Sequence, residues 1–200
     1  GTARYSATGA GTQTAGLGFG GTPPSVAGLT NTEEYDGSSW TAGGALPASK
    51  RDAEGAGTQT AGLCFGGSTN PNANTNTTEH YDGSSWTESG DLSTARNDLA
   101  GNGTQTAGLA FGGATPPASN ATEEYGGSSW TSGGNLGTAR YSATGAGTQT
   151  AGLGFGGRPP SVAGLTNTEE YNGSSWTAGG ALPVAKRGAE GAGTQTAGLC

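Results

Sequence analysis

The chain has 200 residues, of which 42 are glycine, and only 30% are hydrophobic and 12% charged. Its formal net charge of −7 argues against nucleic acid or an anionic membrane surface as a partner, because both attract a basic protein face. No apolar run approaches the ~20 residues that span a bilayer. Glycine enrichment can signal disorder, but disordered chains have few aromatic residues, whereas 4 Trp, 6 Tyr and 4 Phe are regularly placed here. We therefore expect a folded chain.

A tandem repeat of 44 to 47 residues runs through the chain. "GTQTAGL" begins at five glycines, and "GSSWT" follows it four times: Gly11, Gly57, Gly103, Gly147 and Gly193, then Gly37, Gly83, Gly127 and Gly173. An arginine opens each unit: Arg4, Arg51, Arg96, Arg140 and Arg187. The expected repeats are residues 4–50, 51–95, 96–139 and 140–186, with a partial repeat at 187–200. Residues 137–200 copy residues 1–64 with five differences, which include Thr22/Arg158 and Asp36/Asn172. Because the chain begins and ends inside this pattern, we expect it to be a piece of a longer or processed protein.

The first repeat predicts four strands in chain order. Small residues over 5–13 predict the first strand, and the alternation over 14–21 predicts the second, with Ala15, Leu17 and Phe19 on one face. Residues 31–37 and 38–44 predict the third and fourth strands, joined at the hairpin-turn dipeptide Asp36-Gly37. Helical periodicity is absent, so the sequence predicts an all-β chain.

Four short strands per unit, in a unit too small to bury its own core, are typical of a β-propeller blade. The glycines fit this architecture, because inner strands crowd around the propeller axis and the diglycine after Phe19 can adopt backbone conformations that a Cβ forbids. Tyr35 and Trp40 supply most of the apolar area of their unit. We expect these aromatic residues to pack neighbouring blades together.

The repeat resembles the kelch repeat over essentially the whole chain. Each unit carries an apolar strand ending in Phe-Gly-Gly, then a Tyr, a Trp five residues later and a Leu, and an Arg opens the next unit. In the second repeat these are Phe65-Gly66-Gly67, Tyr81, Trp86, Leu92 and Arg96. The resemblance implies a propeller of four-stranded blades, of which about four and a third are present. Kelch propellers generally have five to seven blades, so closure needs further chain, another subunit or an open array.

Two looser resemblances point the same way. "YDGSSW" is similar to the Asp-box turn of sialidase-type propellers, although Gly37 directly follows Asp36, one residue too soon, and the third and fourth repeats carry Gly126 and Asn172 at that position. The near-identical Gly-, Thr-, Ser- and Asn-rich units also resemble repetitive proteins of bacteriophage tails and virion surfaces.

Acidic pairs invite a catalytic interpretation, because glycosidases use two carboxylates. Adjacent strand residues point to opposite faces, however, and the pairs recur in successive repeats, at Glu33-Glu34, Glu123-Glu124 and Glu169-Glu170, with Glu79-His80 in the second. We expect them to form a solvated edge with a charge that holds the nearby Arg, and His80 to be a surface substitution. The glycine-rich segments lack phosphate-loop spacing. Cys64 and Cys200 occupy equivalent positions and are expected to be small buried thiols, with no metal site.

The segment between the diglycine and the acidic pair differs between repeats: "TPPSVAGLTNT", "STNPNANTNTT", "ATPPASNAT" and "RPPSVAGLTNT". Variable loops on a rigid scaffold commonly carry recognition. The candidate ligand-binding residues are Asn70, Asn72, Asn74, Asn76 and Arg158.

Three functional hypotheses follow. The first is a non-enzymatic recognition propeller without a cofactor, located outside the cell on a bacteriophage tail or virion surface. It would contact other virion or surface proteins and a host glycan or protein, and it could form a homo-oligomer. The second is a kelch-type scaffold for protein–protein interaction. The third, and least supported, is a propeller enzyme of glycan-processing or oxidase type, because no repeat carries a unique cluster of acids with a basic partner.

Overall fold

The computed structural model describes residues 3–23, 28–69, 73–161 and 164–199. These residues form 20 strands and no helix, which confirms the all-β prediction. No helix among them could therefore cross a membrane. The chain divides into two compact units, Gly1–Asn97 and Asp98–Cys200.

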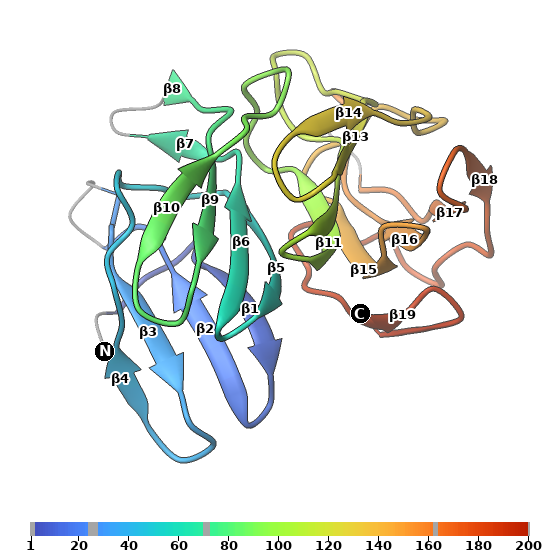
Figure 1. Cartoon of the computed structure of the whole chain (residues 1–200). Coiled ribbons are helices and arrows are strands. Elements are labelled where there is room, and N and C mark those ends of the chain that lie inside the picture. Colours follow the sequence, from blue (N-terminus) through green and yellow to red (C-terminus); the bar gives the residue numbers. More distant parts are fainter. Residues whose placement is uncertain (1–2, 24–27, 70–72, 162–163, 200) are drawn as a thin grey trace. The chain divides into compact units, whose positions relative to one another are not determined.

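The first unit contains two four-stranded antiparallel sheets and a small hairpin (Figure 1). The first sheet has the order β1-β2-β3-β4 and the second has the order β5-β6-β9-β10. The strands are β1 (Thr8–Thr12), β2 (Ala15–Phe19), β3 (Thr32–Tyr35), β4 (Trp40–Ala42), β5 (Glu54–Thr58), β6 (Ala61–Phe65), β7 (Ser68–Thr69), β8 (Ala73–Asn74), β9 (Thr78–Tyr81) and β10 (Trp86–Ser89).

The second unit repeats this plan with two four-stranded sheets, in the orders β11-β12-β13-β14 and β15-β16-β17-β18, and a final hairpin. Its strands are β11 (Ala100–Thr104), β12 (Ala107–Phe111), β13 (Thr122–Tyr125), β14 (Trp130–Ser132), β15 (Thr144–Thr148), β16 (Ala151–Phe155), β17 (Thr168–Tyr171), β18 (Trp176–Ala178), β19 (Ala192–Thr194) and β20 (Ala197–Leu199). The four predicted strands per repeat are thus present in each full repeat.

The strands are shorter than the sequence segments that predicted them. The first begins at Thr8 rather than at residue 5, because Ser6 has a positive φ of 52° that extended backbone does not permit. The predicted hairpin turn at Asp36-Gly37 is present: Gly37 has φ +94°, and the Asp36 carboxylate accepts hydrogen bonds from the Ser38 and Ser39 amides, both at 2.8 Å. The residues of the turn therefore set where β3 ends and β4 begins.

Consecutive sheets within a unit pack large side chains of one repeat against glycines of the next. Leu17 and Phe19 point from β2 into the core, as the alternation predicted, and both are buried. A Cβ added to Gly62 would lie 2.7 Å from Leu17, and one added to Gly55 would lie 2.9 Å from Phe19. These glycines therefore let the two sheets approach to contact distance, and a side chain there would separate them.

The Trp of a repeat covers the Phe of the repeat before it. The rings of Trp86 and Phe19 meet edge to face with centroids 4.8 Å apart, and Trp86 Nε1 donates to Thr32 Oγ1 at 2.8 Å. Trp176 makes the same two contacts with Phe111, at 4.8 Å, and with Thr122 Oγ1, at 2.8 Å. The prediction that aromatic residues join neighbouring sheets is confirmed for these two tryptophans.

That prediction is wrong for Trp40. Its side chain is 52% exposed and packs within its own repeat, where its ring lies 5.1 Å from that of Tyr35 and covers Gly18. Among the described residues, no earlier repeat supplies a Phe and a Thr to meet it. The motif therefore places the Trp on its own sheet, and a preceding repeat is needed to bury it.

The diglycine has the left-handed backbone that the sequence predicted. Gly20 and Gly21 have φ of 62° and 90°. A Cβ on Gly20 would lie 2.6 Å from the carbonyl oxygen of Lys50, while the Gly21 amide donates to that same oxygen at 2.8 Å. The diglycine thereby joins the end of β2 to the segment that opens the next repeat.

Candidate functional site

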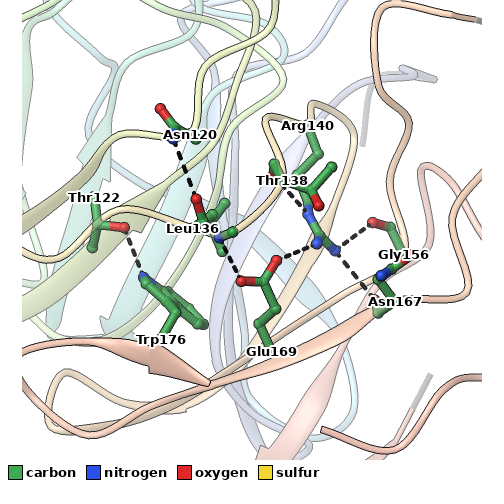
Figure 2. Close-up of polar contacts among 10 residues, drawn as sticks. Asn120, Thr122, Leu136, Thr138, Arg140, Gly156, Asn167, Glu169 and Trp176 are labelled. Carbon is green, nitrogen blue, oxygen red and sulfur yellow. Dashed lines mark hydrogen bonds and ion pairs between the residues drawn. The ribbon is translucent and has the colours of Figure 1, made fainter. Parts of the chain in front are cut away.

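A cation lies where each full repeat opens; it is buried in the second, third and fourth repeats and partly exposed in the first. Figure 2 shows its surroundings in the fourth repeat. Arg140 is fully buried and donates from Nη1 to the carbonyl oxygens of Gly156 and Asn167, both at 3.1 Å. Its Nη2 pairs with the Glu169 carboxylate, whose other oxygen accepts from the Gly137 amide at 2.7 Å. The guanidinium and its carboxylate partner thus bring together the diglycine, β17 and the segment just before Arg140.

The second repeat uses Lys50 here, so the sequence assignment of Arg51 is wrong. Lys50 lies seven residues before Gly57, as Arg140 lies seven before Gly147. Its Nζ is buried and donates to Thr77 O at 3.0 Å and to the Glu79 carboxylate at 2.5 Å. Arg51 is partly exposed, and its Nε lies 4.0 Å from the Asp52 carboxylate.

The acidic pairs have two separate structural roles in the first and third repeats, so their interpretation as a solvated edge is wrong there, whereas Glu170 of the fourth repeat is exposed as predicted. The first acid of the pair faces inward: Glu79, Glu123 and Glu169 are buried, and Glu33, although partly exposed, lies 3.0 Å from Arg4. Holding of the nearby cation is therefore confirmed for Glu33 and Glu169, and Glu79 holds Lys50.

In the first and third repeats the second acid accepts a hydrogen bond from a tyrosine of the next repeat. Tyr81 Oη donates to Glu34, and Tyr171 Oη donates to Glu124. Burial and then this hydrogen bond raise the pKa of each phenol to about 12. In the first repeat Glu33 and Glu34 are thus held on opposite sides of a strand by Arg4 and Tyr81, so this pair could not share a substrate.

Glutamine makes a further contact between repeats that the sequence analysis missed. Gln59 Nε2 donates to the carbonyl oxygens of Gly16 and Tyr35 at 3.1 and 2.8 Å, which closes the turn of one repeat onto the strands of the previous one. Gln149 and Gln195 repeat both bonds. The invariance of Gln within "GTQTAGL" was the available signal, since an exposed turn has no need of one particular residue.

The variable segments all link the second strand of a sheet to the third, at the end opposite the β3–β4 turn. In the first, second and fourth repeats a backbone bridge holds the first residue of the segment. Thr22 pairs with Tyr5, Ser68 pairs with Arg51, and Arg158 pairs with Tyr141. The scaffold therefore presents different side chains from one backbone position.

Arg158 is the most distinctive of these side chains. Its guanidinium carbon lies 4.5 Å from the centre of the Tyr141 ring, a cation–π arrangement. Among the described residues it has no carboxylate partner, and its Nε is buried without a hydrogen bond. The equivalent Tyr5, which has Thr22 as its neighbour, is 58% exposed. Arg158 thus adds an oriented positive charge to one repeat only.

The asparagine candidates do not form one cluster in the described residues. Asn70 and Asn72 lie outside them. Asn74 Oδ1 accepts from the Ser68 hydroxyl at 3.3 Å. Asn76 Nδ2 donates to Leu92 O at 3.0 Å, and Asn120 makes the equivalent bond to Leu136 O at 3.2 Å. Asn76 is therefore a structural residue of the repeat.

The remaining reactive side chains are those of the two cysteines and the histidine. Cys64 is buried and unpaired, and burial raises the pKa of its thiol to about 12. Cys200 lies outside the described residues. His80, predicted to be a surface substitution, lies in β9 and is partly exposed, and desolvation lowers its pKa. Over the described ranges, no three His, Cys, Asp or Glu side chains are grouped so that they could hold a metal ion.

The comparisons with known proteins add no family. No protein-family model matches the chain, and no curated protein matches it significantly.

Proposed function

We propose that the chain is part of a kelch-like β-propeller that recognises a partner through its β2–β3 segments and carries out no reaction. Contacts that recur between consecutive sheets support the scaffold: Phe19 with Trp86, Tyr35 with Gln59, and Glu34 with Tyr81 in the first unit. A propeller is assembled from such four-stranded sheets that each pack against the next.

The observation that carries the recognition role is the contrast between fixed contacts and variable loops. The buried cation, the diglycine and the Tyr–Glu bond have equivalents in both units. Between them, the segments that link the second strand of a sheet to the third differ in sequence, while those of the first, second and fourth repeats start from the same backbone bridge. Differences confined to one type of loop on a constant frame favour binding as the role.

Arg158 favours an acidic ligand. A guanidinium without a carboxylate partner, held over an aromatic ring, suits a ligand carboxylate or sulfate group. The chain has a net charge of −7, so its overall electrostatic field would not attract an acidic ligand. The positive charge of Arg158 would instead bind an acidic group at one position. Acidic polysaccharides of a host surface combine these properties, and the near-identical tandem units suit a bacteriophage tail or virion appendage.

The test is a binding survey of the whole chain on an array of neutral and acidic bacterial surface glycans. We expect binding to acidic glycans, and we expect Arg158→Thr, which copies Thr22 of the first repeat, to weaken it. Loss of one charge-assisted contact costs about 1.5–3 kcal/mol, or roughly tenfold or more in Kd.

The matched control is Arg187→Thr, because Arg187 is an exposed cation outside the variable segments. Equal loss in both variants would point to non-specific charge and contradict the proposal. Binding to a glycan-free host surface protein, with no glycan bound, would favour the kelch-type protein scaffold instead.

A further inference from the structure

The turn between the third and fourth strands has the same form but different caps in the four repeats. Asp36 and Asp82 cap it with a carboxylate, and each accepts bonds from two backbone amides at 2.8 Å. Gly126 has no side chain and leaves only the backbone bond to Ser129 O, at 3.0 Å. In the fourth repeat Asn172 caps with its amide oxygen.

Asn172 is followed by Gly173, and in an Asn-Gly pair the backbone nitrogen of the glycine can attack the side-chain amide of the asparagine. The side-chain carbonyl oxygen of Asn172 accepts from the Ser174 amide at 3.0 Å, the Ser175 amide at 2.9 Å and the Ser174 hydroxyl at 2.9 Å. Asn172 is exposed, and the Gly173 amide has no hydrogen-bond acceptor among the residues the structure describes.

We propose that Asn172 is a site of spontaneous deamidation, which converts the fourth turn from an amide-capped to an acid-capped form. The Gly173 nitrogen attacks Cγ of Asn172, a C–N bond forms, and the Cγ–Nδ2 bond breaks. The leaving amide nitrogen takes the proton of the Gly173 nitrogen and departs as ammonia. Water then opens the resulting cyclic imide to aspartate or isoaspartate, so the overall reaction consumes one water and releases one ammonia.

Three features of the turn favour the attack. Gly173 has no Cβ to obstruct the approach of its nitrogen, and its φ of 88° lies in a region that other residues avoid. The departing nitrogen is on an exposed side chain. The two amides and the hydroxyl on Oδ1 are placed where negative charge develops when Cγ becomes tetrahedral, and fixed donors at such an oxygen stabilise that charge.

The fold also accommodates the aspartate product, because two other repeats already hold it. The second carboxylate oxygens of Asp36 and Asp82 accept from serine hydroxyls at 3.2 and 3.1 Å. The serine donors lower the pKa of Asp82 to about 2, so the acid is ionised at neutral pH. Residues 172–175 have the same Gly-Ser-Ser sequence after the capping residue and would receive the new charge in the same way.

The chain contains a matched control in its other Asn-Gly pair, Asn102-Gly103. Asn102 is buried within β11, and its Nδ2 donates to Ala146 O at 2.6 Å. The leaving group is thus held by the next repeat, and strand pairing fixes the backbone. Reaction at Asn102 would require local opening of two sheets.

The experiment follows both sites by peptide mass spectrometry while the folded chain is incubated at mildly alkaline pH. We expect Asn172 to convert about tenfold or more faster than Asn102, because only Asn102 must wait for opening. In urea-unfolded chain the two rates should converge, since both residues are then followed by glycine. Asn172→Asp provides the mass and retention standard for the aspartate product.

Equal protection of both sites in the folded chain would overturn the proposal. Ser174→Ala tests the activating donors: it removes the hydroxyl, and we expect slower conversion at residue 172 with an unchanged rate at Asn102. If this variant, shown by circular dichroism to be folded, reacted at Asn172 as fast as the parent chain, the proposed activation would be wrong. Neither outcome depends on whether the chain binds a glycan.

Discussion

Trp40 and Trp86 follow the same "YDGSS" sequence, yet the first is 52% exposed and the second 7%. Each lies on its own sheet beside the tyrosine of its repeat, with ring centroids 5.1 and 4.9 Å apart. Only Trp86 also meets Phe19 and Thr32 of an earlier repeat. The comparison shows that a repeat places its aromatic residue by itself, whereas burial comes from the neighbour.

Stability in such an array is concentrated at the interface between consecutive sheets. The interface combines an aromatic contact, a glutamine that closes onto backbone carbonyls and a tyrosine–glutamate bond. Among the described residues, the equivalent residues of the first repeat meet no earlier repeat, so unit 1 contains a matched control for each contact.

The aromatic contact should give the largest difference. Trp86→Ala removes a buried indole and its hydrogen bond to Thr32, and we expect a loss of about 3–5 kcal/mol in the free energy of unfolding. Trp40→Ala removes a half-exposed ring and should cost about 1 kcal/mol or less. Urea unfolding of the two variants measures both values. Similar losses would mean that Trp40 is buried in solution.

The buried ion pair should come next. Glu79→Gln leaves the Lys50 ammonium buried without a counter-charge, and we expect a loss of about 3 kcal/mol in the free energy of unfolding. Glu33→Gln should cost less, because Arg4 and Glu33 keep 10% and 24% of their side chains exposed and water can replace the lost partner. Urea unfolding at neutral pH compares them. A larger loss in Glu33→Gln would contradict the assigned burial.

The sequence predicted the repeated four-stranded sheets well, because each strand carries local signals. Alternation put Leu17 and Phe19 on one face, Asp36-Gly37 made the hairpin turn, and Gly20-Gly21 ended the strand. These signals act within a few residues, so they can be interpreted from the sequence of one repeat without knowing its neighbour.

The sequence predicted the contacts between repeats less well, because they join residues far apart in the chain. Arg51 looked equivalent to Arg4, yet register from Gly57 places Lys50 at the buried position. Glu33 and Glu34 looked like one acidic surface, yet a strand turns one toward Arg4 and the other toward Tyr81. A pattern of charge types does not identify the partner of each charge.

The glutamine contact should have a moderate effect. Gln59→Ala leaves the carbonyl oxygens of Gly16 and Tyr35 without their donor, and we expect a loss of about 1–2 kcal/mol in the free energy of unfolding. Gln13 is exposed and has no hydrogen-bond partner among the described residues, so Gln13→Ala should change stability little. Thermal unfolding of both variants measures the difference. An equal effect would show that the turn, rather than its contact with the previous repeat, needs glutamine.

The turn caps should give the smallest and most pH-dependent difference. Serine donors lower the pKa of Asp82 from 3.8 to about 2 in the folded chain. Because the folded pKa lies below the unfolded one, the stabilisation is fully present above about pH 4 and is lost as the pH falls through about 2. Asp82→Gly copies the third repeat, which has Gly126 at this position, and removes that titration. We therefore expect the stability difference between the parent chain and Asp82→Gly to shrink between pH 4 and pH 2, measured by urea unfolding at several pH values. A difference that stayed constant over this range would mean that the carboxylate charge does not stabilise the turn, and that the neutral cap of Asn172 serves equally well.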